Sequence, residues 1–504
     1  MTRNIHKSGI SRTVLIVIVA VVVVVVVVGG VVAYYVTRPT PTPTPKSILF
    51  YTWWATEGRV AGEHTWPLFS QYFHISVSPY VVPGAGGTAA KYAIIALIEA
   101  GKPPTAFQSH EGPEMVSYIE IAPQGANSFY NTTSYWMSLV TTGNVSIPVI
   151  EAGMYNGHMY LFPVNVHRGA LLFFNPQVLR EYNLPIPTTI EQLYYDAKVL
   201  YQHGICFMIP GADSGWDQFN LWENIFLALG GPKLYMEFLY GTLNLSDPQV
   251  QEIINETNTW FLKFQALDCP GWESLTWTQG LAWVIEGKAA FQTLGDWWVN
   301  YAYDFLNATT YPAIPPYTSW TNITVMTEPF PGTANVYALD VDAVAVPVSP
   351  EEKYGVLFAE WWSSWYWGSG IPGGDPSWTK WKSATFYTNI TTDYYNTPEQ
   401  WWSYQQLTNM SKNPSDWCNF VYQLSDGGVF DDVFAQVNQG LLTYAEVGSV
   451  GTSQWMSTLA SALAEEKAEW LKANSLGLGY LGWPGHYLGC YVPPWVSNTN
   501  TSGS

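Results

Sequence analysis

Aromatic and hydrogen-bonding side chains stand together near the ends of two predicted strands. SILFYTWW (47–54) reads as a strand that ends on Trp53 and Trp54, and TAFQSHEG (105–112) reads as a second strand with Gln108 and His110 at alternate positions. In α/β sheets, ligands bind beyond the carboxyl ends of the strands. These side chains therefore mark a candidate ligand site, in which indole rings offer apolar faces and the amide and imidazole groups offer hydrogen bonds.

The composition favours a neutral, ring-shaped ligand. The 504 residues include 26 Trp, 33 Tyr and 22 Phe, but only 12% are charged. The net charge of −19 argues against a nucleic-acid partner, because binding a phosphate backbone requires clustered Lys and Arg. The chain has no H-E-x-x-H, G-x-S-x-G or P-loop motif. We therefore expect no catalytic residues, no cofactor and no metal site.

Strands that alternate with helices position these side chains. TAAKYAIIALIEAG (88–101) has helical spacing, and TTIEQLYYDAKVLYQHG (188–204) is a helix with a Thr cap and a Gly stop. The stretch 159–176 is strand-like, and DVDAVAVP (340–347) reads as a strand rather than a calcium loop, whose spacing and Glu it lacks. This alternation predicts an α/β body with mainly parallel sheets.

The N-terminal residues predict the compartment. Residues 1–12 carry Arg3, Lys7 and Arg12, and the 24 residues from Thr13 to Val36 carry no charge. A helix of that length crosses a hydrocarbon core of about 30 Å, with the basic end in the cytoplasm and the body outside. Lys7-Ser8-Gly9 resembles the pilin-type signal of archaeal surface proteins, which is cut here after Gly9; an uncleaved anchor fits the residues equally well. The Thr-Pro run 37–46 predicts a stiff spacer that holds the body at the cell surface.

An exported chain with this composition predicts covalent modification. Nine N-x-[ST] sequons make N-glycosylation expected at several of them. The cysteines Cys206, Cys269, Cys418 and Cys490 have no zinc-site spacing, and two disulfides are favoured over four free thiols without a choice of partners. Few cations face the 39 acidic residues, so we expect a fold that persists well below pH 4, as an acid habitat demands.

Three segments, in order, resemble the extracellular sugar-binding proteins of ABC importers. They are IEAGKPPTAFQSHEG (98–112), LFPVNVHRGALLFFNPQVLREYNLPIPTTIEQL (161–193) and VIEGKAAFQTLGDWW (284–298). The chain is most similar to glucose-binding proteins of thermophilic bacteria and thermoacidophilic archaea, through TWWATEG (52–58), FQSH (107–110), PVNVHR (163–168) and GDW (295–297). From residue 300 onward the resemblance is thin.

The resemblance implies a two-lobe α/β fold of the periplasmic-binding-protein type, with three hinge crossings and a sugar in the cleft. We map the crossings to 163–169, 291–298 and 368–374. The N-terminal lobe would then comprise 47–163 plus 299–367, and the C-terminal lobe 168–296 plus 374–495. The expected partners are a sugar ligand, either a glucose-like monosaccharide or a short oligosaccharide, and the permease and ATPase subunits of an importer.

The resemblance also implies which residues bind the sugar. Stacking on Trp suits the C–H faces of a hexose, and carboxylates, amides and His suit its hydroxyls. The candidates are Trp53, Trp54, Glu57, Gln108, His110, Asn165, His167, Trp222, Trp277, Asp296 and Asp426. Asp296 is the strongest carboxylate candidate. Ordinary core packing is an alternative for Trp222 and for the adjacent Trp53 and Trp54, since consecutive strand residues face opposite sides.

The sequence departs from the family pattern at two positions and leaves two other functions open. A lysine that the bacterial relatives carry near the third crossing is missing from WGSGIPGG (367–374), and a family histidine appears as Asp426. Glu57 and Asp296 could form the carboxylate pair of a secreted glycoside hydrolase. The pilin-type signal could instead belong to a structural cell-surface protein.

Overall fold

The structure is a computed structural model that describes residues 47–83, 87–213, 215–313, 322–368, 370–426, 439–445, 448 and 450–496. The apolar run Thr13–Val36 and the Thr-Pro spacer lie outside these ranges. Within the described ranges, no helix is both long enough and apolar enough to cross a membrane.

The first sheet has six strands. They are β1 (Ser47–Thr52), β2 (Ser76–Val81), β3 (Ala106–His110), β4 (Leu161–Arg168), β10 (Tyr337–Ala345) and β13 (Phe420–Tyr422). Strands β1, β2 and β3 are parallel, whereas β10 runs antiparallel to both β3 and β4. Every residue of β3, β4 and β10 is buried, so these strands form the centre of the sheet. The strands predicted at 47–54, 105–112 and 340–347 are thereby confirmed.

The second sheet has five strands. They are β5 (Leu171–Phe174), β6 (Cys206–Met208), β7 (Ala289–Leu294), β8 (Thr310–Pro312) and β9 (Val325–Pro329). Strand β5 is antiparallel to both neighbours, β7 and β9. Both sheets are therefore mixed rather than mainly parallel. The reason is that the chain enters β5 and β10 directly from the other sheet, without a helix that would reverse its direction.

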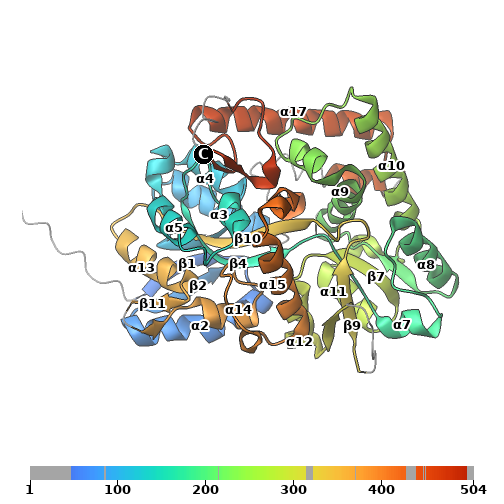
Figure 1. The fold of residues 1–504 in the computed structure, drawn as a ribbon, viewed down its shortest axis with the longest axis horizontal. Helices are drawn as coiled ribbons and strands as arrows, with labels where there is room; N and C mark the ends of the chain where they lie inside the picture. Colours follow the sequence, from blue (N-terminus) through green and yellow to red (C-terminus); the bar gives the residue numbers. More distant parts are fainter. Residues whose placement is uncertain are drawn as a thin grey trace, which may run out of the picture. The chain divides into compact units, whose positions relative to one another are not determined.

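Helices surround both sheets (Figure 1). They are α2 (Glu57–Phe73), α3 (Thr88–Glu99), α4 (Glu114–Ile121), α5 (Thr133–Val140), α6 (Ile147–Ala152), α7 (Pro176–Glu181), α8 (Ile190–Gln202), α9 (Trp216–Leu239), α10 (Pro248–Gln265), α11 (Trp277–Ile285), α12 (Trp298–Leu306), α13 (Glu352–Ser363), α14 (Asp375–Trp381), α15 (Pro398–Ser411) and α17 (Ser453–Ser475). The predicted helices at 88–101 and 188–204 are confirmed as α3 and α8, and Thr189 caps α8 through the backbone N–H of Gln192.

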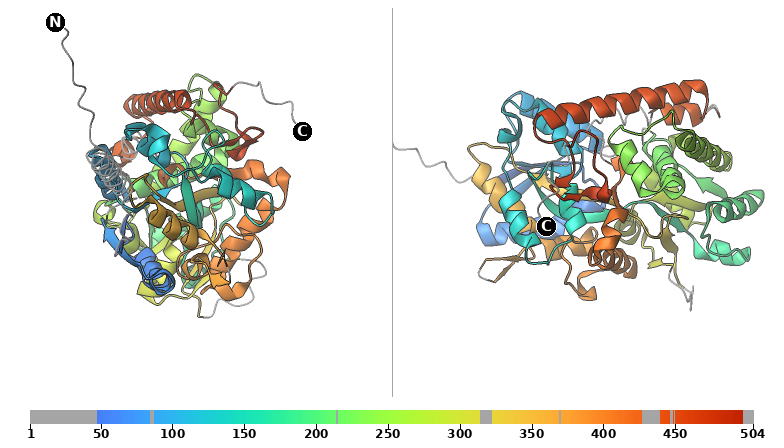
Figure 2. Two further views of the ribbon diagram at one scale, coloured as in Figure 1. Left: turned by 90° about the vertical axis from the view of Figure 1, so that its left-hand side faces the viewer. Right: turned by 45° about the horizontal axis from the view of Figure 1, so that its top comes forward.

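The sheets with their helices define two lobes. Helices α2, α3, α4, α13 and α14 contact strands of the first sheet and form the first lobe with it. Helices α8, α9, α11 and α12 contact strands of the second sheet and form the second lobe. The C-terminal helix α17 reaches both lobes (Figure 2). From α17, Trp470 donates to the backbone carbonyl of Leu239 on α9, and Lys472 pairs with Glu120 on α4.

The chain passes from the first sheet to the second between Arg168 and Leu171. Gly169 lies in this passage, and a Cβ at this position would lie 1.6 Å from the amide oxygen of Gln423, so a larger residue would displace the Gln423 side chain. The passage overlaps the C-terminal end of the first crossing expected at 163–169, most of which forms β4 of the first sheet.

The return to the first sheet lies between Pro329 and Tyr337, C-terminal to the expected position at 291–298. That stretch instead contains part of β7, which is fully buried between β5 and β6 in the second sheet. The resemblance identified the motif correctly, but the motif forms a central strand and not a hinge.

The glycines of GSGIPGG also have a different role from the one expected. They lie in and beside the hairpin of β11 (Tyr366–Trp367) and β12 (Ile371–Pro372), where Gly368 and Gly370 have positive φ. The chain then continues into α14, which packs on α2 of the first lobe. It next runs beside β4, where Ala384 pairs with Val166, before it enters α15.

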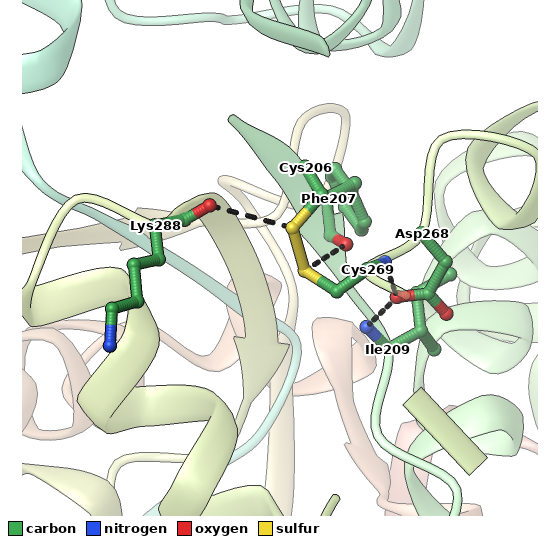
Figure 3. Close-up of a disulfide and its surroundings, with 6 residues drawn as sticks. All are labelled: Cys206, Phe207, Ile209, Asp268, Cys269 and Lys288. Carbon is green, nitrogen blue, oxygen red and sulfur yellow. Dashed lines mark hydrogen bonds between the residues drawn. A yellow bond between two sulfur atoms is a disulfide. The ribbon is translucent and has the colours of Figure 1, made fainter. Parts of the chain in front are cut away.

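Two disulfides are present, as the cysteine pattern favoured. Cys206 pairs with Cys269 in the second lobe, and Cys418 pairs with Cys490. Figure 3 shows the first bridge beside Asp268, whose carboxylate accepts from the backbone N–H groups of Ile209 and Cys269. The bridge therefore fastens the edge strand β6 to the segment that follows α10.

Candidate functional site

A cleft of about 320 Å³ lies between the two lobes. From the first lobe and its passages, the lining residues are Trp53, Trp54, Ala55, Thr56, Glu57, Pro83, His110, His167, Asp340, Asp342 and Lys382. From the second lobe, the lining residues are Asp213, Trp216, Thr276, Trp277, Thr278 and Trp297. The cleft thus combines indole rings on both walls with charged groups from β3, β4 and β10.

Indole rings form the apolar part of both walls. Trp53 follows β1 and is half-buried, with its ring 5.0 Å from the imidazole of His110. On the opposite wall, the rings of Trp216 and Trp297 lie 5.6 Å apart, and Trp277 begins α11. These flat apolar faces suit a ligand ring with C–H groups on its faces.

Two of the predicted tryptophans belong largely to the core. Trp54 is only 4% exposed and packs 4.7 Å from the ring of Trp378, although its edge reaches the cleft. Trp222 on α9 is fully buried, donates to the amide oxygen of Asn258 at 2.8 Å and does not line the cleft. Successive residues of an extended chain face opposite sides, which is why Trp53 is turned to the cleft and Trp54 to the core.

Lys382 is the centre of a buried charge network at the base of the cleft. Its ammonium nitrogen lies 3.1 Å from Oε1 of Glu57, 3.0 Å from Nε2 of His167 and 3.7 Å from Oδ2 of Asp342. Burial would lower the pKa of Lys382, but the carboxylates of Glu57 and Asp342 raise it. Burial would also raise the pKa of Glu57, but Lys382 and the hydroxyl of Thr56 lower it. Each charge in this network thus depends on its partners.

Lys382 is a lining residue that the sequence analysis did not predict. The lysine expected from the resemblance was sought in the glycine-rich stretch 367–374, which has none. The chain instead reaches the cleft after α14, and Lys382 is the first residue beyond that helix. A buried lysine beside the two lining acids Glu57 and Asp342 is a site feature that the glycine pattern concealed.

Asp296 lies behind the cleft. Its Oδ1 lies 2.6 Å from Nδ1 of His167, and its Oδ2 accepts a 2.5 Å hydrogen bond from Ser403 on α15. Both oxygens are therefore engaged, and Asp296 does not line the cleft. Burial and Lys382 oppose protonation of His167, but its hydrogen bonds to Asp296 and Asp342 prevail and raise its pKa to about 9. Asp296 therefore orients His167 and favours its protonated form, and His167 does line the cleft.

Gln108 and Asn165 lie beneath the cleft and hold Asp342. The amide of Gln108 donates to Oδ1 of Asp342 at 2.8 Å, and the amide of Asn165 donates to Oδ2 at 3.0 Å. The other ends of both side chains are occupied by the hydroxyl of Thr52 and the indole N–H of Trp378. Neither side chain lines the cleft, so both act on it through Asp342.

His110 stands at the cleft surface as an imidazolium. Its Nδ1 lies 2.9 Å from Oε2 of Glu114, and its Nε2 lies 3.6 Å from Oδ1 of Asp340. Burial would lower the pKa of His110, but Asp340 and Glu114 outweigh it and raise this pKa to about 10. The same contacts, together with Lys91, hold the pKa of Glu114 at about 2 in spite of burial.

Asp340 is a buried acid that lines the cleft. Its Oδ1 is itself buried and has no hydrogen-bond partner among the described residues, with Nε2 of His110 3.6 Å away. A carboxylate at the cleft wall that is not fully hydrogen-bonded is an acceptor for a ligand hydroxyl. Sequence reasoning missed Asp340 and Asp342, although two acids at alternate positions of an otherwise apolar strand are a readable signal for one face of a site.

Two further residues complete the comparison with the sequence. Asp213 lines the second-lobe wall and accepts from the backbone N–H of Trp277, and it was not predicted. Asp426 ends the short 3-10 helix η6 (Leu424–Asp426), and its side chain lies outside what the structure describes. Within the described part of the chain, no group of His, Cys, Asp and Glu could hold a metal ion.

The two-lobe fold and the cleft define a class of protein. Residues 63–364 match the model of the bacterial extracellular solute-binding protein family. This match covers more than half of the chain, and the chain belongs to that family.

A curated relative is similar along most of its length. The chain is 51% identical over 458 residues to the glucose-binding protein GlcS of Saccharolobus solfataricus, which covers 90% of this chain and 80% of the relative. Among solved structures, a chitin oligosaccharide binding protein superposes with a TM-score of 0.63 at 14% identity, over 84% of this chain and 99% of that one. Maltose-bound MalE3 of T. maritima superposes with a TM-score of 0.57 at 13% identity, with the same coverage. These structures share the two-lobe α/β fold with this chain.

Proposed function

We propose that this protein is an extracellular receptor that binds a glucose-like hexose in the interlobe cleft and delivers it to the permease and ATPase subunits of an ABC importer. The observation that carries the proposal is the cleft itself, with indole faces on both walls and the carboxylate of Asp340 beside them. The family membership and the likeness to a glucose-binding protein support the sugar as ligand class.

The roles of the cleft residues follow from their chemistry. Trp53 and Trp277 offer stacking surfaces from opposite lobes, so a bound ring would hold the lobes together. Asp340 accepts a hydroxyl hydrogen bond, and Lys382 and His110 donate to hydroxyl oxygens. The cleft volume of about 320 Å³ is at the small end of the range for ligand pockets, which favours one hexose ring in the cleft.

Stacking and hydroxyl recognition should separate in two variants. Trp277→Ala should weaken glucose, galactose and mannose to a similar extent, because stacking tolerates different hydroxyl arrangements. Asp340→Asn should weaken the preferred hexose by about ten- to hundredfold and reduce the differences between epimers, since hydrogen bonds to charged groups contribute about 1.5–3 kcal/mol. Calorimetric titration of each variant with the three hexoses measures both effects.

The matched control is Trp283→Ala on the same helix as Trp277. Trp283 does not line the cleft, so this variant should bind all three hexoses as the unchanged protein does. If Asp340→Asn left every affinity unchanged in a folded protein, or if no hexose bound the unchanged protein, the proposed site would be wrong.

We also propose that residues 13–36 anchor the receptor in the membrane and that cleavage after Gly9 leaves this helix on the mature chain. The uncharged run, its basic N-terminal flank and the pilin-like Lys-Ser-Gly support this proposal. The expected result is a membrane-bound mature protein that begins at Ile10. Mass spectrometry of the native N-terminus measures it, and a mature chain that begins near Ser47 would contradict it.

N-glycosylation is part of the same proposal. All eight sequon asparagines that the structure describes are exposed, which leaves their amides accessible to an oligosaccharyltransferase. They are Asn131, Asn144, Asn244, Asn255, Asn307, Asn322, Asn389 and Asn409. None of the eight lines the cleft, so glycans at these positions leave the ligand site open.

A further inference from the structure

Aromatic rings continue outward from the cleft along α12. Trp277 lines the cleft, and the ring of Tyr301 meets it edge-on with centroids 5.1 Å apart. Tyr301 in turn stacks on Phe305, one helical turn further, at 5.0 Å and 20°. Phe305 is 49% exposed, which is unusual for a phenylalanine in a helix that packs on a sheet. The rings therefore form a continuous row from the cleft wall to solvent.

Asp304 lies on the same side of α12 as this row. Residues 301, 304 and 305 have the i, i+3, i+4 spacing of one helix face. Oδ2 of Asp304 is buried and has no hydrogen-bond partner among the described residues. Burial and then the carboxylate of Glu57 raise the pKa of Asp304 to about 6, so this face of the second lobe approaches a cleft-lining acid of the first lobe. Helices α12 and α2 are also in contact.

We propose that this face of α12, made of Tyr301, Asp304 and Phe305, is a second sugar subsite that receives a hexose unit linked to the one in the cleft. The inference rests on the proposed function and extends the ligand class to short oligosaccharides. The row is continuous with the cleft through Trp277, so a glycosidic chain that leaves the cleft along this wall meets the exposed ring of Phe305 next.

The chemistry of the face favours a sugar over an apolar partner. Asp304 is half-buried, so its side chain is partly open to solvent beside an exposed ring, and this pairing matches the C–H face and hydroxyl edge of a hexose. A purely apolar occupant would remove water from this carboxylate without replacing its hydrogen bonds, which is unfavourable. The cleft volume of about 320 Å³ favours one hexose ring, so a second unit linked to it is expected at the rim.

The test is a calorimetric titration of the full-length chain with glucose, maltose and cellobiose. Phe305→Ala should weaken the better-bound disaccharide by about two- to tenfold, the range expected for loss of one aromatic contact, and should leave glucose within about twofold. Tyr303→Ala is the matched control, because Tyr303 is similarly exposed at 42% but points to the opposite side of α12. This control should change neither affinity.

The outcomes separate the inference from the proposed function. Binding of glucose alone, with neither disaccharide bound, would overturn the subsite and leave the hexose receptor intact. An equal loss for glucose and the disaccharide in Phe305→Ala, or no loss for either, would also overturn it. Failure of the unchanged protein to bind any of the three sugars would overturn both proposals.

Discussion

Replacing Lys382 by alanine should lower the free energy of unfolding by about 3–5 kcal/mol and weaken sugar binding by at least about a hundredfold. The large effect follows from what remains in the variant, because Glu57, Asp342 and His167 keep their buried places without the ammonium that balances the acids. Removal of one partner of a buried ion pair is far more destabilising than removal of an exposed one. Urea unfolding and calorimetric titration with glucose measure the two effects.

The control for this prediction is Lys233→Ala. Lys233 is 80% exposed and lies 3.8 Å from Glu237 on the same helix, a surface pair that contributes little. This variant should unfold and bind sugar as the unchanged protein does. A Lys382→Ala protein with unchanged stability would show that water or a change of protonation already compensates the buried charges. This result would contradict the electrostatic account of the cleft.

The second large effect concerns pH, and the free energy of unfolding should rise by several kcal/mol as the pH falls from about 9 to about 5. Burial raises the pKa of Glu223 to about 7, of Asp375 to about 8 and of Glu328 to about 9. In the unfolded chain these acids ionise near pH 4, so the folded state binds their protons more tightly. Their contribution to stability is present below pH 4 and is lost as the pH rises through the folded values.

The two cleft histidines act in the same direction. The pKa of His167 is raised to about 9 and that of His110 to about 10, so their stabilising contribution is complete below about pH 6.5 and is lost above it. Acids with a lowered pKa act in the opposite direction. Glu114, whose pKa is about 2, stabilises the fold above its unfolded value near 4.5 and stops doing so as the pH falls toward 2. Maximum stability is therefore expected at about pH 4–5.

Chemical denaturation at a series of pH values between 2 and 9 tests this profile. The variant Glu328→Gln should flatten the slope on the alkaline side, because the glutamine has no proton to lose. Exposed Glu252→Gln serves as the control and should leave the profile unchanged. A protein that is more stable at pH 8 than at pH 5 would contradict the prediction. The composition predicts that the fold persists below pH 4. The buried acids, which are protonated in this range, are a second reason to expect it.

Much of the fold could be predicted because its signals are local. The helical spacing of 88–101, the Thr cap of 188–204 and the apolar run of 47–54 each depend on a few neighbouring residues. The return between the sheets could not be located in the same way. Nothing within β7 indicates which sheet it joins, because a fully buried strand has the same apolar sequence pattern in either sheet.

The candidate site was predictable where side chains follow strand ends. Trp53, His110, His167 and Trp277 line the cleft, as their positions and the family motifs indicated. Three further candidates lie close to the cleft but behind its wall, namely Gln108, Asn165 and Asp296. Their depth depends on the partners Thr52, Trp378 and Ser403, which come from distant parts of the chain.

Lys382 and Asp340 were missed for a related reason. The role of each depends on residues that are far away in the sequence. Lys382, for example, contacts Glu57, from which it is separated by 325 positions. A lysine after a short helix and an aspartate inside a strand are ordinary features until the fold brings them to one cleft. Long-range charge pairs of this kind leave no local pattern in the sequence.

The central claim is that the interlobe cleft is the sugar site, and a crystal structure of the full-length protein grown with saturating glucose tests it most directly. The result expected is one hexose between the lobes, with a C–H face on Trp277 or Trp53 and a hydroxyl within hydrogen-bond distance of the Asp340 carboxylate. A hexose bound elsewhere, or a cleft that holds only water at saturating glucose, would contradict the account.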